Sequence, residues 1–418
     1  MQVRFQQPLP PAVESRGDGP HGGVAVAEPP GARTAPARKS VTARRAQPQP
    51  HDRPQSQSRP RPRPRPRLYV IDGIRLVAAL MVALHHYTGT NRANQPGNAI
   101  WGRPVSEIMP TVFHFASFGW IGVEIFFVIS GFVICMSCWG RTPKDFFVSR
   151  VIRLYPAYWV GVAFTTVTLF VLPGVWQRPQ GRDILLNFTM LQSGSNVPDV
   201  DIVYWTLWSE LRFYLLFMLV VAMGLTYRRV VVFCCVWGAA AMLAPVSKFP
   251  LLVLAADPSG AWYFIAGLAL YLMHRFGQDL LLWGILAMAW LMGQRELGLR
   301  VAYEDVSSWR GAVLIFTVFL LVMVAVALGY TDRVRWKWLV TAGCLTYPLY
   351  LMHYVAGAAL IGRLRDTMDP RLLVALVIAG FLALSWLVHR FVERPAARLL
   401  KHGLESSFTR LRAFGRAA

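Results

Sequence analysis

The sequence predicts an all-α integral membrane protein of about ten transmembrane helices, preceded by a disordered basic N-terminal tail. Of its 418 residues, 55% are hydrophobic and only 16% are charged, and the mean hydropathy is +0.39. An ordinary soluble core cannot bury that much apolar surface. Clear spans are expected to begin near Tyr69, Phe118, Leu154, Trp205, Val230, Ala312, Leu339 and Leu372, and shorter apolar runs cover residues 261–273 and 280–292.

Residues 1–67 differ in composition from everything that follows. They contain 13 Lys and Arg, 4 Asp and Glu, and 14 of the 28 prolines. A chain of this kind cannot bury a core and adopts extended, partly polyproline-like conformations. We therefore expect a disordered Arg/Pro-rich cytoplasmic tail that acts as a solvated positive flank, and we predict no nucleic-acid partner.

Lys and Arg in the short loops predict the orientation of the chain. Cytoplasmic loops carry an excess of these residues. The predicted inner loops and flank hold Arg141, Lys144, Arg150, Arg228, Arg229, Arg275, Arg333, Arg335, Lys337, Arg390, Arg394, Arg398 and Lys401. Both termini are thus expected on the cytoplasmic side of the inner membrane, with a membrane domain at residues 68–402 and a short basic tail at 403–418.

The five cysteines lie in or beside apolar segments and indicate neither disulfides nor a metal site.

The first span, which begins at Tyr69, carries Asp72, Arg75, His85 and His86. An ionisable side chain at membrane depth costs about 2.5 to 3.5 kcal/mol, so such residues usually face a protein interior or a water-filled site. Arg75 and His86 are eleven residues apart, which leaves them about 20° apart around a helix and about 16 Å apart along it. One helix face therefore carries a cation near one membrane surface and an imidazole near the other.

A second basic group is expected at the inner end of the third span. Arg150 and Arg153 are three residues apart and lie on one side of a helix. Forked guanidinium donors suit phosphate or pyrophosphate, although ordinary positive-inside flanking explains this pair equally well. Arg75 lies deeper in its helix, where Asp72 could neutralise it.

Histidines and carboxylates gather toward the predicted outer side. His86, Glu124, Glu210 and His353 all fall there. A neutral His86, oriented by Glu210 or Glu124, could accept the proton of a hydroxyl group, whereas His85 fits a hydrogen-bonded core residue better.

Six segments in order resemble the membrane-bound acyltransferase family 3. They are IDGIRLVAALMVALHHY, GWIGVEIFFVISGFVI, RVIRLYPAYW, WTLWSELRFYLLF, TYPLYLMHY and RFVERPAARLL. The matching positions are Arg75, His86, Glu124, Arg150, Arg153, Trp205, Thr206, Leu207, Glu210, Phe213, Tyr214, Tyr350, His353, Glu393 and Pro395. The resemblance covers nearly the whole membrane domain and predicts the stand-alone form, without a fused hydrolase-like domain.

The resemblance implies an O-acyltransferase that uses acyl-CoA, expected to be acetyl-CoA, as co-substrate and needs no bound cofactor or metal. Arg75, Arg150 and Arg153 would bind the donor. The implied catalytic residues are His86, Glu210 and Glu124, and the implied substrate-binding residues are Tyr214, Tyr350 and His353. The acceptor would be a hydroxyl of a cell-surface glycan, exopolysaccharide, glycolipid or glycosylated natural product.

The sequence leaves the catalytic route and the function class open. His86 could act as a general base in direct transfer or as a transient acyl carrier. Intramembrane His and Glu residues also serve proton relays, so a proton-coupled transporter or flippase for a glycan or lipid-linked substrate is the alternative function. A scaffold protein acting through the Arg/Pro tail is weaker, and we expect catalysis to survive removal of residues 1–60.

Overall fold

The computed structural model describes residues 68–90, 100–172, 176–247, 249–304 and 307–417. Helices make up this part of the chain and no strand occurs in it, which confirms the predicted all-α membrane fold. The tail predicted for residues 1–67 lies outside the described residues.

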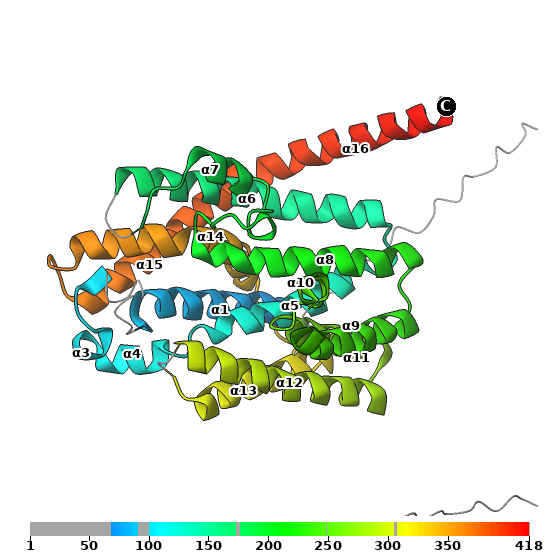
Figure 1. Ribbon diagram of the computed structural model, residues 1–418, viewed down its shortest axis with the longest axis horizontal. Helices are drawn as coiled ribbons and strands as arrows, with labels where there is room; N and C mark the ends of the chain where they lie inside the picture. Colours follow the sequence, from blue (N-terminus) through cyan, green and yellow to red (C-terminus); the bar gives the residue numbers. More distant parts are fainter. Residues whose placement is uncertain (1–67, 91–99, 173–175, 248, 305–306, 418) are drawn as a thin grey trace, which may run out of the picture. The chain divides into compact units, whose positions relative to one another are not determined.

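The long helices run side by side in alternating directions (Figure 1). In chain order the elements are α1 (Tyr69–Thr88), α3 (Val105–Ile108), α4 (Pro110–Ala116), α5 (Ile121–Cys138), α6 (Pro143–Val171), α7 (Gly181–Asn187), η1 (Ser193–Ser195), η2 (Ile202–Tyr204), α8 (Trp205–Met223), α9 (Tyr227–Ser247), α10 (Pro250–Ala256), α11 (Ala261–Phe276), α12 (Leu280–Glu304), α13 (Trp309–Ala327), α14 (Trp338–Leu364), α15 (Pro370–Val388), η3 (His389–Glu393) and α16 (Arg394–Ala417). The predicted boundary between residues 402 and 403 falls inside α16.

Nine helical stretches within the described residues are long and apolar enough to cross a membrane. The short apolar run at 261–273 belongs to one of them, which extends from Pro250 to Phe276. The other short run, at 280–292, is only the first half of α12, a 25-residue helix whose second half contains charged residues. Helix α12 packs alongside α11 and α13 (Figure 1), but it is not among these nine stretches, one fewer than the ten expected.

Helix α1 lies between α5 and α14, and small residues allow these helices to approach it closely. A Cβ atom added at Gly122 of α5 would lie 2.5 Å from the carbonyl oxygen of Ala78 in α1. One added at Gly343 of α14 would lie 2.4 Å from Oδ1 of Asp72. Membrane helices associate through such close packing, because lipid supplies no hydrophobic force between them.

The contact between α5 and α11 depends on two glycines in the same way. A Cβ atom at Gly131 of α5 would lie 2.2 Å from the carbonyl oxygen of Phe264, and one at Gly267 of α11 would lie 2.0 Å from that of Val128. Both neighbours are backbone atoms, so neither can move without shifting a helix.

Residues 181–204 contact both α6 and α14. Tyr158 of α6 donates a hydrogen bond from its hydroxyl to the carbonyl oxygen of Asn187, at 2.6 Å. The buried Asp201 accepts hydrogen bonds from the backbone N–H groups of Val203 and Val355, both at 3.3 Å. Asp201 therefore ties this segment to the middle of α14, two residues beyond His353.

We predict that Gly131→Ala destabilises the protein by about 1 to 3 kcal/mol, because the added methyl group forces α5 and α11 apart. Gly284→Ala on α12 is the matched control, since a Cβ atom there meets nothing within 4 Å. Thermal unfolding of the detergent-solubilised protein measures both. Equal unfolding midpoints for the two variants would contradict this account of the packing.

Candidate functional site

Three cavities follow one another along α1. The basic cavity is lined by Asp72, Arg75, Arg150, Arg153, His389 and Arg394, among others, and has an empty volume of about 950 Å³. The middle cavity is lined by Arg75, Phe126, Ser130, Thr206, Glu210 and Tyr350, among others, with about 520 Å³. The histidine cavity is lined by His85, His86, Trp205, Arg300, Glu304 and Tyr354, among others, with about 1000 Å³.

Shared residues join these cavities into a series. Arg75 and Tyr347 line both the basic and the middle cavity. Val123 and Tyr350 line both the middle and the histidine cavity. The series therefore extends from the Arg75 end of α1 to its His86 end, and the two side chains that the sequence placed on one helix face open into it.

The basic cavity brings together the three arginines that the sequence assigned to donor binding. Arg150 donates a hydrogen bond from Nη2 to Oγ of Ser149 at 2.9 Å, and its guanidinium carbon lies 5.9 Å from the ring centre of Tyr214. Arg153 is exposed and makes no hydrogen bond to the described residues. With Arg394, four guanidinium groups face this cavity together with two carboxylates, those of Asp72 and Glu393. This excess of forked cations suits a phosphorylated ligand.

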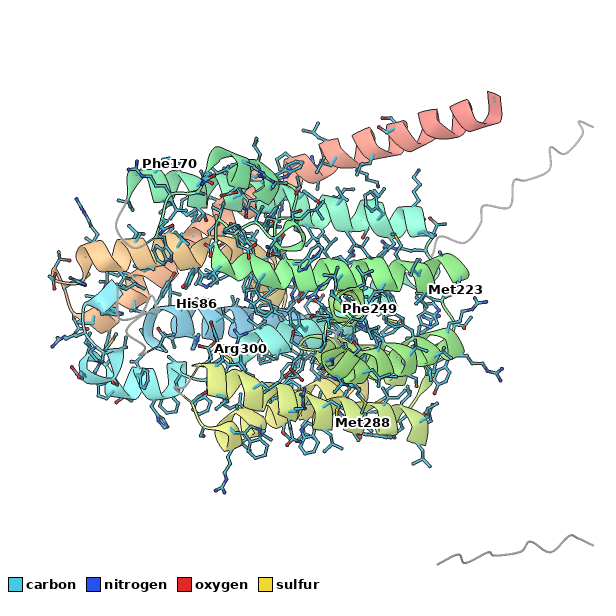
Figure 2. The ribbon with its side chains drawn as sticks, viewed as in Figure 1. His86, Phe170, Met223, Phe249, Met288 and Arg300 are labelled. Carbon is cyan, nitrogen blue, oxygen red and sulfur yellow. The ribbon has the colours of Figure 1, made fainter. Side chains whose placement is uncertain are left out.

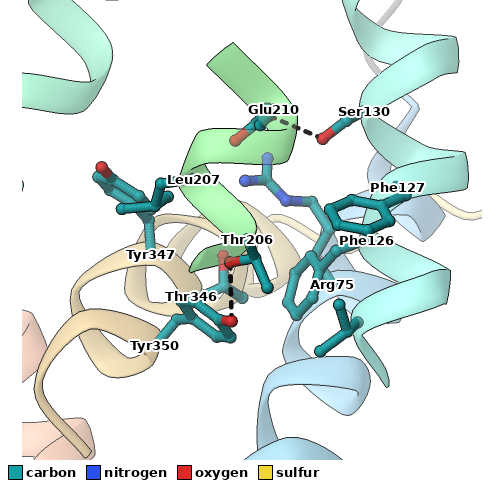
Figure 3. A pocket seen from close by; sticks show the side chains of 11 residues that line it. Arg75, Phe126, Phe127, Ser130, Thr206, Leu207, Glu210, Thr346, Tyr347 and Tyr350 are labelled. Atoms are coloured by element: carbon teal, nitrogen blue, oxygen red, sulfur yellow. Dashed lines mark hydrogen bonds between the residues drawn. The ribbon is translucent and has the colours of Figure 1, made fainter. Parts of the chain in front are cut away.

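Glu210 lies in the middle cavity, where Figure 3 shows the guanidinium group of Arg75 directed toward it. Its Oε1 accepts a hydrogen bond from Oγ of Ser130 at 2.9 Å and another from the hydroxyl of Tyr214. The helical spacing of Glu210 and Tyr214 in the sequence is thus confirmed as a contact. The carboxylate of Glu210 counterbalances Arg75 and makes no hydrogen bond with His86.

The ring of His86 is held by another histidine, His353 of α14. Nδ1 of His86 lies 2.8 Å from Nε2 of His353. Nδ1 of His353 lies 3.1 and 2.9 Å from the carbonyl oxygens of Leu349 and Tyr350, which can only accept. With both rings neutral, His353 carries its proton on Nδ1, and its Nε2 accepts the Nδ1–H of His86. This arrangement leaves Nε2 of His86 unprotonated.

This arrangement differs from the expectation that a glutamate orients His86. His353 is fully buried behind His86, and the hydroxyl of Tyr87 donates a 2.6 Å hydrogen bond to its carbonyl oxygen. Among the residues assigned to substrate binding, Tyr350 lines the middle and histidine cavities. His353 and Tyr214 line none of the three cavities, but they bond to His86 and Glu210, which do. His353 is accordingly placed to set the tautomer of His86.

Glu124 is buried near the histidine cavity. Its Oε2 has no hydrogen-bond partner among the described residues, and the charges within electrostatic reach are those of Arg300 and Glu304. Glu124 is therefore close to the charged end of α12 and not bonded to His86. No group of three or more His, Cys, Asp or Glu side chains in the described part of the chain is arranged to hold a metal ion.

Helix α12 contributes residues to this site that were not predicted from the sequence. Arg300 and His86 come from different helices and lie near each other (Figure 2). Nε of Arg300 donates a 3.1 Å hydrogen bond to Oε1 of Glu304, whose Oε2 lies 3.9 Å from Nε2 of His85. Nδ1 of His85 lies 3.0 Å from the carbonyl oxygen of Ala116, consistent with a core role. The available signal was the four-residue spacing of Arg300 and Glu304, which fits a continued helix.

The family described as "Acyltransferase domain" matches residues 68–390. The chain belongs to this acyltransferase family. Three curated relatives align with most of this acyltransferase. The chain is 25% identical over 382 residues to "Acyltransferase MdmB" of Streptomyces mycarofaciens, and the alignment covers 80% of this chain and 92% of that protein.

Two further relatives match over a similar range. "Nodulation protein 10" of Rhizobium leguminosarum bv. viciae is 26% identical over 361 residues, covering 78% of this chain and 93% of that protein. "O-acetyl transferase" of Shigella phage Sf6 is 26% identical over 356 residues, covering 78% and 97%. No solved structure matches this acyltransferase. Family membership and the relatives' names support an acyltransferase activity.

We predict that His353→Ala lowers the rate of acyl transfer about 100-fold or more, because His86 loses the acceptor that fixes its tautomer. His353→Gln should recover part of that rate, since an amide oxygen can accept the Nδ1–H of His86. The rates are measured in membranes that contain equal amounts of each folded variant. Equal rates for the Ala and Gln variants would contradict the tautomer assignment.

Proposed function

We propose that this acyltransferase transfers an acetyl or similarly short acyl group from acyl-CoA in the basic cavity to a sugar hydroxyl in the histidine cavity. The observation that carries the proposal is the series of cavities from Arg75 to His86. It connects a phosphate-binding set of arginines to an imidazole with a free nitrogen. The donor identity and acceptor class rest on this arrangement together with family membership.

In this proposal, the basic cavity binds the phosphates of coenzyme A and the middle cavity binds its pantetheine arm. Its phosphates would lie among Arg75, Arg150 and Arg153, whose forked donors match phosphate oxygens. Its pantetheine arm is long and narrow and carries amide and hydroxyl groups. The middle cavity offers it both apolar side chains, such as Phe126 and Phe127, and hydroxyl groups, such as that of Thr206. The rise of about 16 Å along α1 from Arg75 to His86 is comparable to the length of that arm.

His86 would then act through Nε2. In direct transfer, this nitrogen accepts the proton of the acceptor hydroxyl while the hydroxyl oxygen bonds to the acyl carbon. The carbon–sulfur bond of the thioester breaks, and the leaving thiolate takes the proton from His86. In a relay, Nε2 attacks the acyl carbon first, the carbon–sulfur bond breaks and the thiolate leaves. The acceptor hydroxyl then attacks the acyl carbon, the carbon–Nε2 bond breaks, and the hydroxyl proton goes to the thiolate. Both routes need the unprotonated nitrogen that His353 provides.

The histidine cavity suits a sugar acceptor. It combines aromatic surfaces, from Trp205, Tyr303 and Tyr354, with the charged pair Arg300 and Glu304. Aromatic faces and charged hydrogen-bonding groups are what a ring with several hydroxyls requires. The name of the phage relative, "O-acetyl transferase", is consistent with an oxygen acceptor.

The same proposal includes an orientation. The basic cavity would face the cytoplasm, where acyl-CoA is made, and the histidine cavity would face the outer side of the cytoplasmic membrane. With α12 crossing the bilayer, α1 begins and α15 ends on the same side, as the Lys and Arg distribution predicts.

We predict that His86→Ala lowers the release of CoA from acetyl-CoA at least about 100-fold, because the reaction loses the group that accepts the hydroxyl proton. The assay uses purified protein, radiolabelled acetyl-CoA and a panel of nitrophenyl glycosides. His274→Ala is the matched control, since His274 is also a partly buried helix histidine but contacts the carbonyl oxygen of Ala327 and lines none of the three cavities.

Two results would contradict the proposed function. Unchanged acyl transfer by His86→Ala would exclude the histidine from the chemistry. Glycan or lipid movement by the wild-type protein without any acyl donor would favour the transporter alternative. A labelled His86 adduct that hydroxylamine releases would select the relay over direct transfer.

A further inference from the structure

A π-helical turn, η3, forms one wall of the basic cavity. It covers residues 389–393, between α15 and α16, and the backbone N–H of Arg394 donates to the carbonyl oxygen of His389, five residues back. Single π turns inside α-helices are rare and often occur at functional sites. The turn has a local cause in Pro395, which has no N–H to continue the α-helical pattern.

The wider turn places three side chains in one hydrogen-bonded chain. Nδ1 of His389 lies 2.5 Å from Oε2 of Glu393, and the carboxylate can only accept, so Nδ1 carries a proton. Nε of Arg394 donates to Nε2 of His389 at 3.3 Å. Residues five apart would face different directions on an ordinary α-helix, whereas the five-residue bonding of η3 brings Arg394 over His389.

These hydrogen bonds leave the two terminal nitrogens of Arg394 available to bind a ligand. Its Nε is used by His389, and its two terminal nitrogens make no hydrogen bond to the described residues. Arg394, His389 and Glu393 all line the basic cavity, and Glu393 is bonded to His389 instead of to a guanidinium group. Arg394 is thus an oriented cation whose forked face has no protein partner in the described part of the chain.

Arg394 and Arg75 lie at different places in the lining of the basic cavity. Arg75 also lines the middle cavity, so it marks the end where the pantetheine arm would leave. Arg394 lines only the basic cavity among the three that form the series. A ligand that extends from Arg75 toward Arg394 needs a second anionic group at its far end. Coenzyme A has one, because its ribose carries a 3′-phosphate remote from the diphosphate.

We infer that Arg394, held in place by His389 and Glu393, binds the 3′-phosphate of the acyl-CoA donor and makes the protein discriminate coenzyme A from dephospho-coenzyme A. The inference rests on the proposed function, because it assumes that the donor enters the basic cavity. It adds a specificity-determining residue from the C-terminal part of the membrane domain to the three arginines that the sequence assigned to donor binding.

The test compares the binding of coenzyme A and dephospho-coenzyme A to the full-length protein in detergent by titration calorimetry. Wild type should bind coenzyme A more tightly. Arg394→Ala should weaken coenzyme A binding about tenfold or more while leaving the affinity for dephospho-coenzyme A unchanged. The matched control is Arg390→Ala, since Arg390 is also exposed on η3 but lies over the ring of Phe391 and does not line the cavity. Binding by this control should equal that of wild type.

Three outcomes would overturn the inference. Arg394→Ala could bind coenzyme A as wild type does, it could lose affinity for both ligands equally, or Arg390→Ala could lose the same discrimination. His389→Ala adds a second check, because loss of the ring frees Nε of Arg394 and should reduce the preference for coenzyme A. If wild type binds neither ligand, the proposed function itself fails, which is a separate result from failure at Arg394.

Discussion

Lipid tolerates ionisable side chains at membrane depth only where protein surrounds them, and the whole site depends on how α1 meets this constraint. Arg75 and His86 lie on α1, and α5 and α14 pack against it so closely that Gly122 and Gly343 leave no room for a side chain. The same packing that shields α1 from lipid also holds both residues against the cavities.

The polar groups that the helices shield from lipid lie in pairs. Arg75 faces Glu210, whose carboxylate Ser130 also holds, so the middle of the series is close to neutral. At the far end, two histidines bond to each other, and carbonyl oxygens of α14 fix the tautomer of His353 and, through it, that of His86. Buried polar networks of this kind are rigid when every member is satisfied. The rigidity supplies the fixed geometry that proton transfer requires.

Much of the fold and part of the site could be predicted from sequence, because the cost of charge in lipid makes Arg75 and His86 visible without any structure. Apolar runs revealed most helices for the same reason. The bond between His86 and His353 was not predictable, since it depends on the depth of α14 relative to α1. The second half of α12 was missed because its charges resemble those of a loop, and only the packed helix brings Arg300 into the cavity.

In the proposed function, the acyl donor binds on one side of the membrane and the acceptor on the other. The most direct measurement uses proteoliposomes with the protein in one orientation, radiolabelled acetyl-CoA on one side only and the accepted glycoside on the other. Acetyl-CoA does not cross lipid unaided, so the account predicts labelled ester on the glycoside side. Ester formation that requires donor and acceptor on the same side would contradict it.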